Sequence, residues 1–559
     1  MRSILIIGGA GTFGARILRL LAETQAFRLI IGGRDLARAE GVRASVPDAT
    51  IEVARFDRKG DLATQLAALK PWAVIDAAGP FQDETPTRYA VPAACIELGI
   101  HYIDLADSRA FVTGIAALDA AARAAGVAIL SGASSVPAFS TAIVDDLTCQ
   151  MRDVVAIDIA LSASNRATAG PSVNAAILSY VGQGIRYRAS GGWQTGHGWQ
   201  CLARKSFAVS GHRSIEGRLV GLCDVPDLDL LPERFPSVRH VMFRAGAELV
   251  VQNLVLWLLS FPVRWHWLRS LSRFAVLFNH LQKWSSFLGS DRSALSVGVS
   301  GRNREGEPMQ ALWTLIAEDG HGPWVPSFAA VLLTQKLAAG GVPAGARPAI
   351  GQLTLADFAP LFAKFHLFTE TRRWPLPPPL YARVLGPDFA RMPAPVRAMH
   401  AFIAGDRVAG RGHVERGADP VARLVGWAFR FPPAQADVPV EVAFSINDRG
   451  ETWRRNFAGH RFGSHLSSRL VDGKPVLIET FWPFTFDFDL SGHESGLEME
   501  IRAWRLIGLK LPRALAPRVT ATERVIDGRF SFNVCIALPW GPLIVHYAGW
   551  LAPHIGPGA

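Results

Sequence analysis

Three glycines near the N-terminus have the spacing of a dinucleotide-binding turn. Gly9, Gly11 and Gly14 form G-x-G-x-x-G directly after the apolar residues 4–7, and residues 15–22 follow with apolar side chains at helical spacing. The first glycine permits a tight turn, the second lets backbone N–H groups approach a pyrophosphate, and the third allows a helix to pack closely on a strand. The order of strand, glycines and helix therefore predicts a nicotinamide dinucleotide site.

The end of the second predicted strand, residues 29–31, indicates which dinucleotide is bound. An NAD site would place Asp or Glu there for the ribose hydroxyls, but this chain has Gly32-Gly33-Arg34. An arginine fork pairs with phosphate oxygens, which a carboxylate would repel, so Arg34 favours the 2′-phosphate of NADP. In the alternative interpretation Arg34 is a solvated residue beside Asp35, and Asp35 caps the next helix. Both roles can coexist.

Other residues suited to a ligand site follow further predicted strands. They are Asp57 after residues 51–56, Ala78, Gly79 and Pro80 at the end of residues 73–80, Asp104 within residues 101–105, and Ser131, Gly132 and Ser134 after residues 127–130. Strand ends of a parallel sheet meet at one edge, so we expect these residues to line one crevice. The alternation of strands and helices predicts an α/β, Rossmann-like doubly wound parallel sheet.

Two side chains on one of these strands are candidates for catalysis. Strand alternation places Tyr102 and Asp104 on the same side of the sheet. We expect Asp104 to orient a substrate and Tyr102 to supply a proton. Core packing is the alternative for Tyr102.

Four signatures in one order resemble the saccharopine dehydrogenase-like family of NADP-binding reductases. They are Gly9-Ala10-Gly11-Thr12-Phe13-Gly14, Gly32-Gly33-Arg34, Ala78-Gly79-Pro80-Phe81, and the pair Gly99-Ile100-His101-Tyr102-Ile103-Asp104 with Gly132-Ala133-Ser134-Ser135-Val136-Pro137. The resemblance spans roughly residues 1–360. It implies an NADP site that includes Thr12 and Phe13, and a substrate crevice at Asp104 and residues 131–136. Saccharopine-forming members carry a Cys-Gly loop where this chain has Ser131-Gly132, which disfavours an amino-acid substrate.

The whole chain divides into several predicted units, as 559 residues require. Residues 1–150 form the Rossmann domain, and residues 151–325 form a mixed α/β domain for substrate or dimerisation. A helix at residues 326–339 returns to the first domain, and the proline-rich residues 371–379 mark a linker. Residues 376–559 alternate as antiparallel strands of an all-β barrel or sandwich. This part resembles an uncharacterised domain found behind saccharopine dehydrogenase-like modules.

Composition excludes several classes of function. A hydrophobic fraction of 49% and a mean hydropathy of +0.18 exclude a disordered chain. The net charge is +10, but there is no Lys/Arg run of the kind that binds nucleic acid. Five scattered cysteines indicate neither a metal site nor disulfides, so we expect a reducing, cytoplasmic location.

The most hydrophobic segment of the chain is residues 247–283. It is too interrupted to cross a bilayer, but residues 265–283 place Trp267, Leu271, Phe274, Phe278 and Leu281 on one face of a predicted helix with arginines beside them. Three interpretations stay open: the helix lies peripherally on the inner face of a membrane, covers a greasy substrate pocket, or packs on its own domain or on the twin subunit of a homodimer.

These observations predict an NADP(H)-dependent oxidoreductase. Hydride would pass to or from a C=N or C=C bond of a small-molecule or lipid-like substrate between the first two domains. The alternative is a non-catalytic NADP-binding protein whose C-terminal β-domain binds a hydrophobic ligand.

Overall fold

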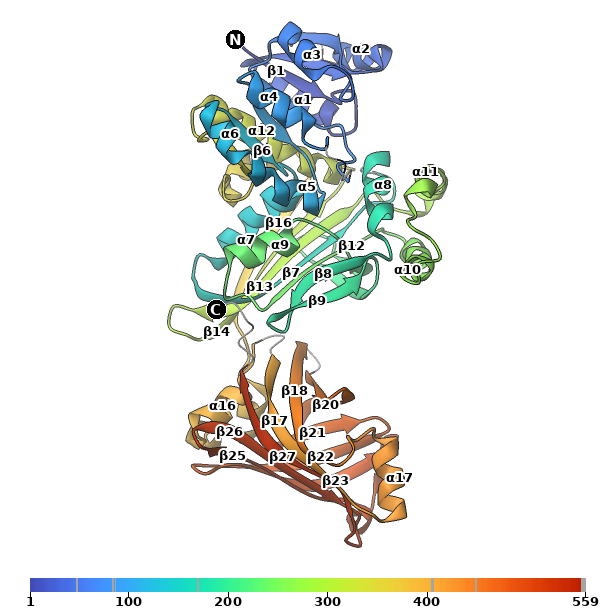
Figure 1. Cartoon of the computed structure of the whole chain (residues 1–559), viewed down its shortest axis with the longest axis vertical. Coiled ribbons are helices and arrows are strands. Elements are labelled where there is room, and N and C mark those ends of the chain that lie inside the picture. The colour runs from blue at the N-terminus through green and yellow to red at the C-terminus, as the bar shows by residue number, and fades with distance from the viewer. Residues whose placement is uncertain are drawn as a thin grey trace.

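The computed structural model describes residues 1–46, 49–82, 85, 87–167, 170–403, 407–447 and 450–553. Three β-structures follow one another along the long axis of the molecule: a parallel sheet, a mixed sheet and a barrel (Figure 1). This order confirms the predicted fold class.

The first sheet has seven parallel strands in the order β15-β6-β5-β4-β1-β2-β3. Its strands are β1 (Arg2–Ile7), β2 (Phe27–Gly33), β3 (Ile51–Arg55), β4 (Ala73–Asp76), β5 (His101–Asp104), β6 (Ala128–Ser131) and β15 (Gly345–Pro348). The helices between them are α1 (Gly14–Ala22), α2 (Leu36–Ala44), α3 (Leu62–Leu69), α4 (Ala90–Glu97), α5 (Arg109–Gly114) and α6 (Asp119–Ala124). The central strands β1, β4, β5 and β6 are buried on both faces, as their continuous apolar runs require, whereas the edge strand β3 is only partly buried.

The second sheet is mixed, with the order β10-β11-β12-β7-β13-β14-β16. Only the pair β12–β7 is parallel. Its strands are β7 (Met151–Ser162), β10 (Ala203–Phe207), β11 (Ile215–Leu222), β12 (His240–Gly246), β13 (Ser293–Asn303), β14 (Pro308–Ala317) and β16 (Leu367–Pro375). The other elements are the hairpin β8 (Gly184–Ala189) with β9 (Gly192–His197), α7 (Ser140–Thr148), α8 (Pro171–Tyr180), α9 (Asp227–Arg234), α10 (Val250–Arg264), α11 (Ala275–Trp284), α12 (Val325–Ala338) and α13 (Ala359–Phe362).

The expected linker begins later than the proline content suggested. Residues 371–375 belong to β16, which pairs with β14 at the edge of the mixed sheet. An edge strand tolerates proline because one row of its N–H groups has no partner strand. Pro375 is the last residue of the strand, and the chain leaves the sheet after it.

The single helix predicted over residues 265–283 is wrong. Helix α10 ends at Arg264, His266 has a left-handed backbone with φ of 62°, and α11 starts only at Ala275. The break also divides the expected apolar face, because Leu271 is buried while Trp267 is exposed. Within the described residues, no helix is long and apolar enough to cross a membrane.

The C-terminal part is a closed antiparallel barrel, which decides between the two predicted forms. The order β22-β21-β20-β19-β18-β17-β27-β26-β25-β23 closes through the pair β23–β22, and β24 (Leu509–Leu511) extends β23. The barrel strands are β17 (Arg407–Arg416), β18 (Gln435–Asn447), β19 (Gly450–Phe457), β20 (His460–Val471), β21 (Lys474–Phe481), β22 (Phe484–His493), β23 (Gly496–Leu506), β25 (Arg518–Ile526), β26 (Arg529–Ala537) and β27 (Leu543–Pro553). Short helices α14 (Leu380–Leu385), α15 (Asp388–Arg391) and α16 (Ala394–Met399) precede them, and α17 (Pro420–Ala428) lies between β17 and β18.

The first two sheets share one hydrophobic core, whereas the barrel has its own. Helix α12 follows β14 of the mixed sheet in the sequence and packs against α1 of the first domain. Helix α7 packs against β13 and β14. Residues 1–375 therefore form one body with two sheets.

Close packing of α1 on β1 predicts the effect of a single methyl group. A Cβ on Gly14 would stand 2.3 Å from the carbonyl oxygen of Gly8, so Gly14→Ala should destabilise the body of residues 1–375 by roughly 1–3 kcal/mol. Gly41→Ala is the matched control, since its Cβ would meet nothing within 4 Å and α2 should gain up to about 1 kcal/mol. Calorimetry of the full chain measures both changes, and equal melting temperatures for the two variants would contradict this account of the turn.

Candidate cofactor and substrate cleft

One large cleft lies between the parallel sheet and the mixed sheet. Its volume is about 2160 Å³, and its walls come from both sheets and from α8, α10 and α11. The carboxyl ends of β1, β2, β3 and β4 reach it, which is where an open parallel sheet binds its ligand.

The glycine turn forms one end of the cleft. Gly11, Thr12 and Phe13 line it, while Gly9 and Gly14 lie behind them and allow α1 to approach β1. Among the described residues, no acceptor receives the N–H groups of Thr12 and Phe13. Free N–H groups at the start of a helix suit a pyrophosphate, so the turn fits a dinucleotide.

Basic side chains surround the end of β2. Arg34 lines the cleft, is exposed and makes no ion pair with a described residue. Asp35 is engaged elsewhere: its carboxylate accepts a hydrogen bond from the N–H of Arg38 at 3.0 Å and caps α2. Asp57 also lines the cleft, with its carboxylate held by the N–H of Lys59 at 3.0 Å. Arg34 is therefore a cation of this end that no described carboxylate neutralises, and Arg38 and Lys59 line the cleft beside it.

The turn after β4 forms the middle of the cleft. Ala78, Gly79 and Pro80 all line it, and the Gly79–Pro80 peptide is cis. Arg58 supports this turn by donating to the carbonyl of Ala78 and by pairing with the buried Asp76 at 3.1 Å.

The predicted catalytic pair lies outside the cleft. Tyr102 is fully buried, with its hydroxyl 3.4 Å from Asp76, and Asp104 is fully buried as well. One oxygen of Asp104 accepts bonds from Ser131 Oγ at 3.0 Å and from the N–H of Gly132 at 2.8 Å. Burial raises the pKa of Asp104 to about 7 despite these bonds. These contacts give Asp104, Ser131 and Gly132 the role of holding the loop after β6.

Of the loop predicted to line the substrate crevice, residues 131–136, Ser134, Ser135 and Val136 line the cleft. Ser131 and Gly132 are held beneath it by Asp104, because their loop turns toward the sheet before it reaches the cleft wall.

Two titratable side chains in the cleft were not predicted from the sequence. Asp107 accepts a hydrogen bond from Gln82 Nε2 at 3.0 Å, and burial raises its pKa. Tyr180 is hydrogen-bonded to the thiol of Cys223, and burial together with the nearby charges of Cys223 and Asp107 raises its pKa well above its usual range. Both groups hold their protons more firmly than exposed ones would.

Asp107 was missed in the sequence because it lies three residues after Asp104, outside every motif that pointed to the site. Tyr180 is at the end of α8 in the mixed domain, and only the folding of that domain brings it to the cleft.

Helix α8 joins the two glycine-rich turns. A Cβ on Gly170, just before α8, would stand 2.7 Å from Thr12 Oγ1, and Ser172 Oγ donates to the carbonyl of Gly79 at 3.3 Å. The mixed domain thereby closes the cleft over the nucleotide turn.

The remaining wall of the cleft is largely apolar. It includes Leu161, Ile177, Trp199, Val225, Phe243, Leu256 and Phe278. An apolar molecule could bury its surface here, beside the polar nucleotide end.

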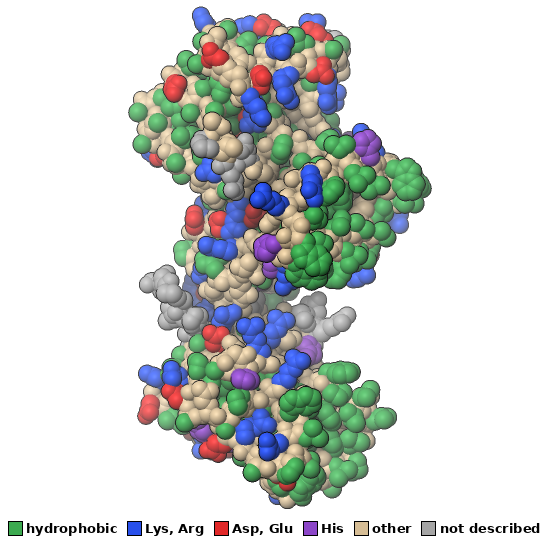
Figure 2. Space-filling model, turned by 45° about the vertical axis from the view of Figure 1, so that its right-hand side comes forward, with side chains coloured by type: hydrophobic (Ala, Val, Ile, Leu, Met, Phe, Trp, Pro, Cys, Tyr) green, Lys and Arg blue, Asp and Glu red, His purple; other side chains and the backbone are tan. Residues whose placement is uncertain are grey.

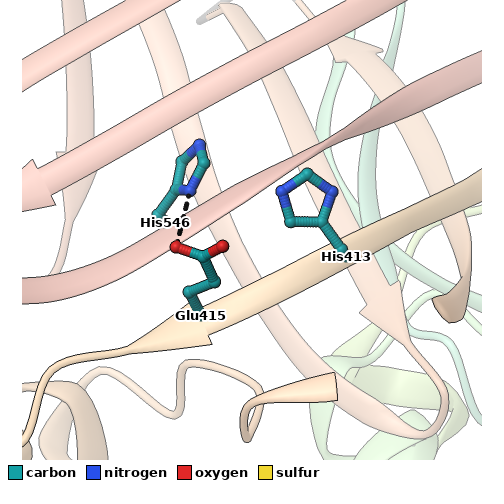
Figure 3. A group of neighbouring side chains, drawn as sticks. All are labelled: His413, Glu415 and His546. Carbon is teal, nitrogen blue, oxygen red and sulfur yellow. Dashed lines mark hydrogen bonds and ion pairs between the residues drawn. The ribbon is translucent and has the colours of Figure 1, made fainter. Parts of the chain in front are cut away.

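A second group of polar side chains lies on the barrel. His413 and Glu415 on β17 and His546 on β27 place their ligating atoms within 4.8 Å of one another (Figure 3). Glu415 already accepts from His546 Nδ1 at 3.3 Å, and His546 Nε2 lies 2.8 Å from Asn533 Oδ1. A metal ion would have to replace these bonds, so we assign the group to the pairing of neighbouring strands.

The barrel encloses a separate cavity of about 160 Å³. Aromatic and aliphatic side chains form most of its wall. Three charged side chains, Arg455, Glu479 and Glu523, also line it. Arg455 is bonded to Ser464 Oγ at 2.9 Å and paired with Glu479 at 3.3 Å, so these two charges neutralise each other.

Two parts of the chain match known families. Residues 4–130 match the saccharopine dehydrogenase NADP binding domain, and residues 392–551 match a domain of unknown function (DUF4166). The resemblance inferred from the sequence is confirmed for these two parts. No curated protein is similar to the chain at a significant level.

Similar solved structures include saccharopine dehydrogenase (L-Glu forming) from Saccharomyces cerevisiae, at 11% identity and a TM-score of 0.48, covering 67% of this chain and 100% of that one. GenD2 from gentamicin A biosynthesis in complex with NAD is 15% identical, with a TM-score of 0.28 and coverage of 57% and 74%. The dehydrogenase MviM from Clostridium difficile is 9% identical, with a TM-score of 0.31 and coverage of 61% and 92%. All three TM-scores are below 0.5.

The position of Arg34 predicts the effect of removing it. Arg34→Ala should weaken NADPH binding about 10- to 100-fold and leave NADH binding unchanged, because only NADPH carries the 2′-phosphate. Arg43→Ala is a matched control, since Arg43 pairs with Glu40 on α2 and lies outside the cleft lining. Fluorescence titration of both cofactors measures these affinities. Equal weakening of NADPH and NADH would show that Arg34 does not recognise the phosphate.

Proposed function

We propose that this protein is an NADP(H)-dependent oxidoreductase that transfers hydride to or from a C=N or C=C bond of an apolar, lipid-like substrate. One observation carries the proposal: a single cleft joins the glycine turns at the parallel sheet to an apolar wall of the mixed sheet. The family match of residues 4–130 supports the nicotinamide cofactor.

Residues of the first sheet would hold the cofactor. The N–H groups of Thr12 and Phe13 face a pyrophosphate, Arg34 faces the 2′-phosphate, and Gly79 with Pro80 lies along the path to the nicotinamide. When bound, the nicotinamide supplies or accepts the hydride. Arg34 stands where an NAD site would carry a carboxylate, and this favours NADP over NAD.

The walls favour an apolar substrate over an amino acid. An amino-acid site needs paired charges for its ammonium and carboxylate groups, whereas the wall beyond Gly79 is formed chiefly by side chains such as Trp199 and Phe243. We therefore expect the substrate to carry an enone or a similar C=C bond on an apolar molecule, and not to be an amino-acid imine.

Asp107 is the proposed proton donor. Asp107 lines the cleft and accepts a hydrogen bond from Gln82, which lies two residues after Pro80 in the turn proposed to hold the nicotinamide. Burial raises the pKa of Asp107. A carboxyl group with a raised pKa keeps a proton that it can give to a substrate. Burial, Cys223 and the Asp107 carboxylate raise the pKa of Tyr180, so its hydroxyl keeps its proton and would donate a hydrogen bond that polarises the acceptor.

The direct test is NADPH oxidation against a panel of imines and apolar enones. We expect turnover with at least one enone and none with amino-acid imines. Tight NADPH binding without turnover on any member would contradict the enzymatic proposal and favour a binding protein.

Substitution of the proton donor separates it from the buried aspartate on the preceding strand. Asp107→Asn should lower kcat by roughly 10²- to 10⁴-fold without changing the Kd of NADPH. Asp104→Asn is the matched control: its amide oxygen can accept the same three bonds, so activity should stay near that of the wild type. Loss of activity in Asp104→Asn with an unchanged melting temperature would restore the catalytic role first predicted for Asp104.

The pH dependence follows from the direction of the pKa shift. The protonated form of Asp107 gives the proton, so kcat/KM for reduction should be highest at low pH and fall as the pH rises through the raised pKa. Asp107→Asn should remove this descending limb. An unchanged pH profile in that variant would assign the proton to another group.

A second proposed function concerns the barrel, because its cavity of about 160 Å³ is lined chiefly by apolar side chains. A cavity of about this size holds a benzene-sized molecule. We propose that the barrel binds a small apolar ligand or the end of a longer one.

Benzene is a suitable probe of the cavity in the full chain. Benzene should raise the melting temperature of the barrel by mass action. The substitution Ala521→Phe, at a residue that lines the cavity, should fill the space that benzene would occupy and abolish that rise. A rise that survives Ala521→Phe would place the benzene elsewhere.

A further inference from the structure

Two exposed apolar surfaces lie on the same side of the molecule (Figure 2). The first, here called the helical patch, covers α10, α11 and the segments that adjoin them, and includes Val251, Leu258, Trp265, Trp267, Val276 and Trp284. The second, the barrel patch, lies at one end of the barrel and consists of Leu424, Trp427, Trp482, Ile507 and Leu509.

The helical patch exposes more apolar side chains than the solvent-exposed surface of a soluble protein usually does. Trp267 is 74% exposed and Trp284 is 72% exposed. Soluble proteins rarely leave a continuous apolar area of this kind in water unless it binds something. One side of α10 and of α11 already packs on the mixed domain. The exposed side of each helix is therefore covered by no described residue and is free to bind a partner.

The barrel patch is assembled from segments far apart in the sequence. Phe429, the residue after α17, packs on Phe484 with ring centroids 5.3 Å apart, and the N–H of Ile507 donates to the carbonyl of Pro483 at 2.9 Å. These contacts gather α17 and two hairpin tips at one end of the barrel. Trp427 is 77% exposed there and Trp482 is 86% exposed.

The charges around both patches identify the chemistry of the partner. Residues 249–290 contain no Asp or Glu, but they contain Arg264, Arg269, Arg273 and Lys283. Residues 420–434 and 503–516 also lack acidic side chains and carry several arginines and Lys510. The tryptophans of residues 249–290 and Trp427 thus lie in segments whose charged side chains are all cations. Such segments match the interface of an anionic bilayer, where indoles lie at headgroup level and cations meet lipid phosphates.

We propose that the helical patch and the barrel patch together dock the protein on the surface of an anionic lipid bilayer. Two patches on one side favour a broad surface over a single peptide, which would occupy one groove. A second copy of the chain fits less well, because facing patches would bring like charges together.

The helical patch continues into the cleft. Val251, Val255, Leu281 and Trp284 are exposed side chains that also line the cleft. Asn174 of α8 donates to Asn279 and to Gln282 of α11, and α8 in turn touches the glycine turns. If the proposed function holds, docking sets the mouth of the cleft against the bilayer, and a lipid-like substrate can enter without crossing water.

Co-sedimentation of the full chain with vesicles tests the docking without any enzymatic assay. We expect binding to vesicles of phosphatidylcholine with phosphatidylserine, weaker binding to phosphatidylcholine alone, and a loss of binding at high salt. The double variants W265S/W267S and W427S/W482S should each weaken binding about tenfold or more.

The double variant L98S/L470S is the matched control, because it removes two exposed leucines outside both patches and should bind as the wild type does. Unchanged melting temperatures and NADPH affinities show that the tryptophan variants are folded. No binding to anionic vesicles, full binding by either tryptophan variant, or dissociation of a dimer by these substitutions without vesicle binding would each overturn the proposal. Failure of the proposed function would instead appear as a lack of turnover with vesicle binding intact.

Discussion

The packing of Phe139 between the two sheets holds the rest of the nucleotide-binding body in place. Its ring lies edge-on to Trp313 of the mixed sheet at 5.5 Å, and it contacts Phe358 at 4.6 Å and Phe362 at 5.7 Å. It stands just before α7, after the loop that Asp104 anchors. Because one buried cluster joins both sheets, their separation is set by packing, and with it the width of the cleft.

The cleft between the two sheets has two chemically different ends. The parallel sheet contributes backbone N–H groups and Arg34, which suit a phosphorylated cofactor, and the mixed sheet contributes an apolar wall. Helix α8 links them, since it touches Thr12 and Gly79 at one end and carries Tyr180 at the other. The barrel shares no core with this body, so its cavity and its exposed end can act independently of the chemistry in the cleft.

The parts of the molecule that could be predicted from the sequence are local ones. The glycine turn depends on three residues in one strand–turn–helix unit, and Asp35 caps α2 as its position indicates. The division at residues 265–283 could not be predicted, because the 3.6-residue period continues through a left-handed backbone at His266. Tyr102 and Asp104 followed the rule that strand ends face the ligand, but burial beneath the loop after β6 removes them from it. Tyr180 enters the site through a long-range arrangement of two domains that no local pattern contains.

A crystal structure of the full chain with NADPH would show where the nicotinamide lies. We expect Arg34 to contact the 2′-phosphate and the C4 face of the nicotinamide to point into the apolar part of the cleft, with Asp107 and Tyr180 in hydrogen-bonding reach of an acceptor placed there. A nicotinamide that lies away from the apolar wall, or one whose C4 face meets Tyr102 and Asp104 instead, would contradict this expectation.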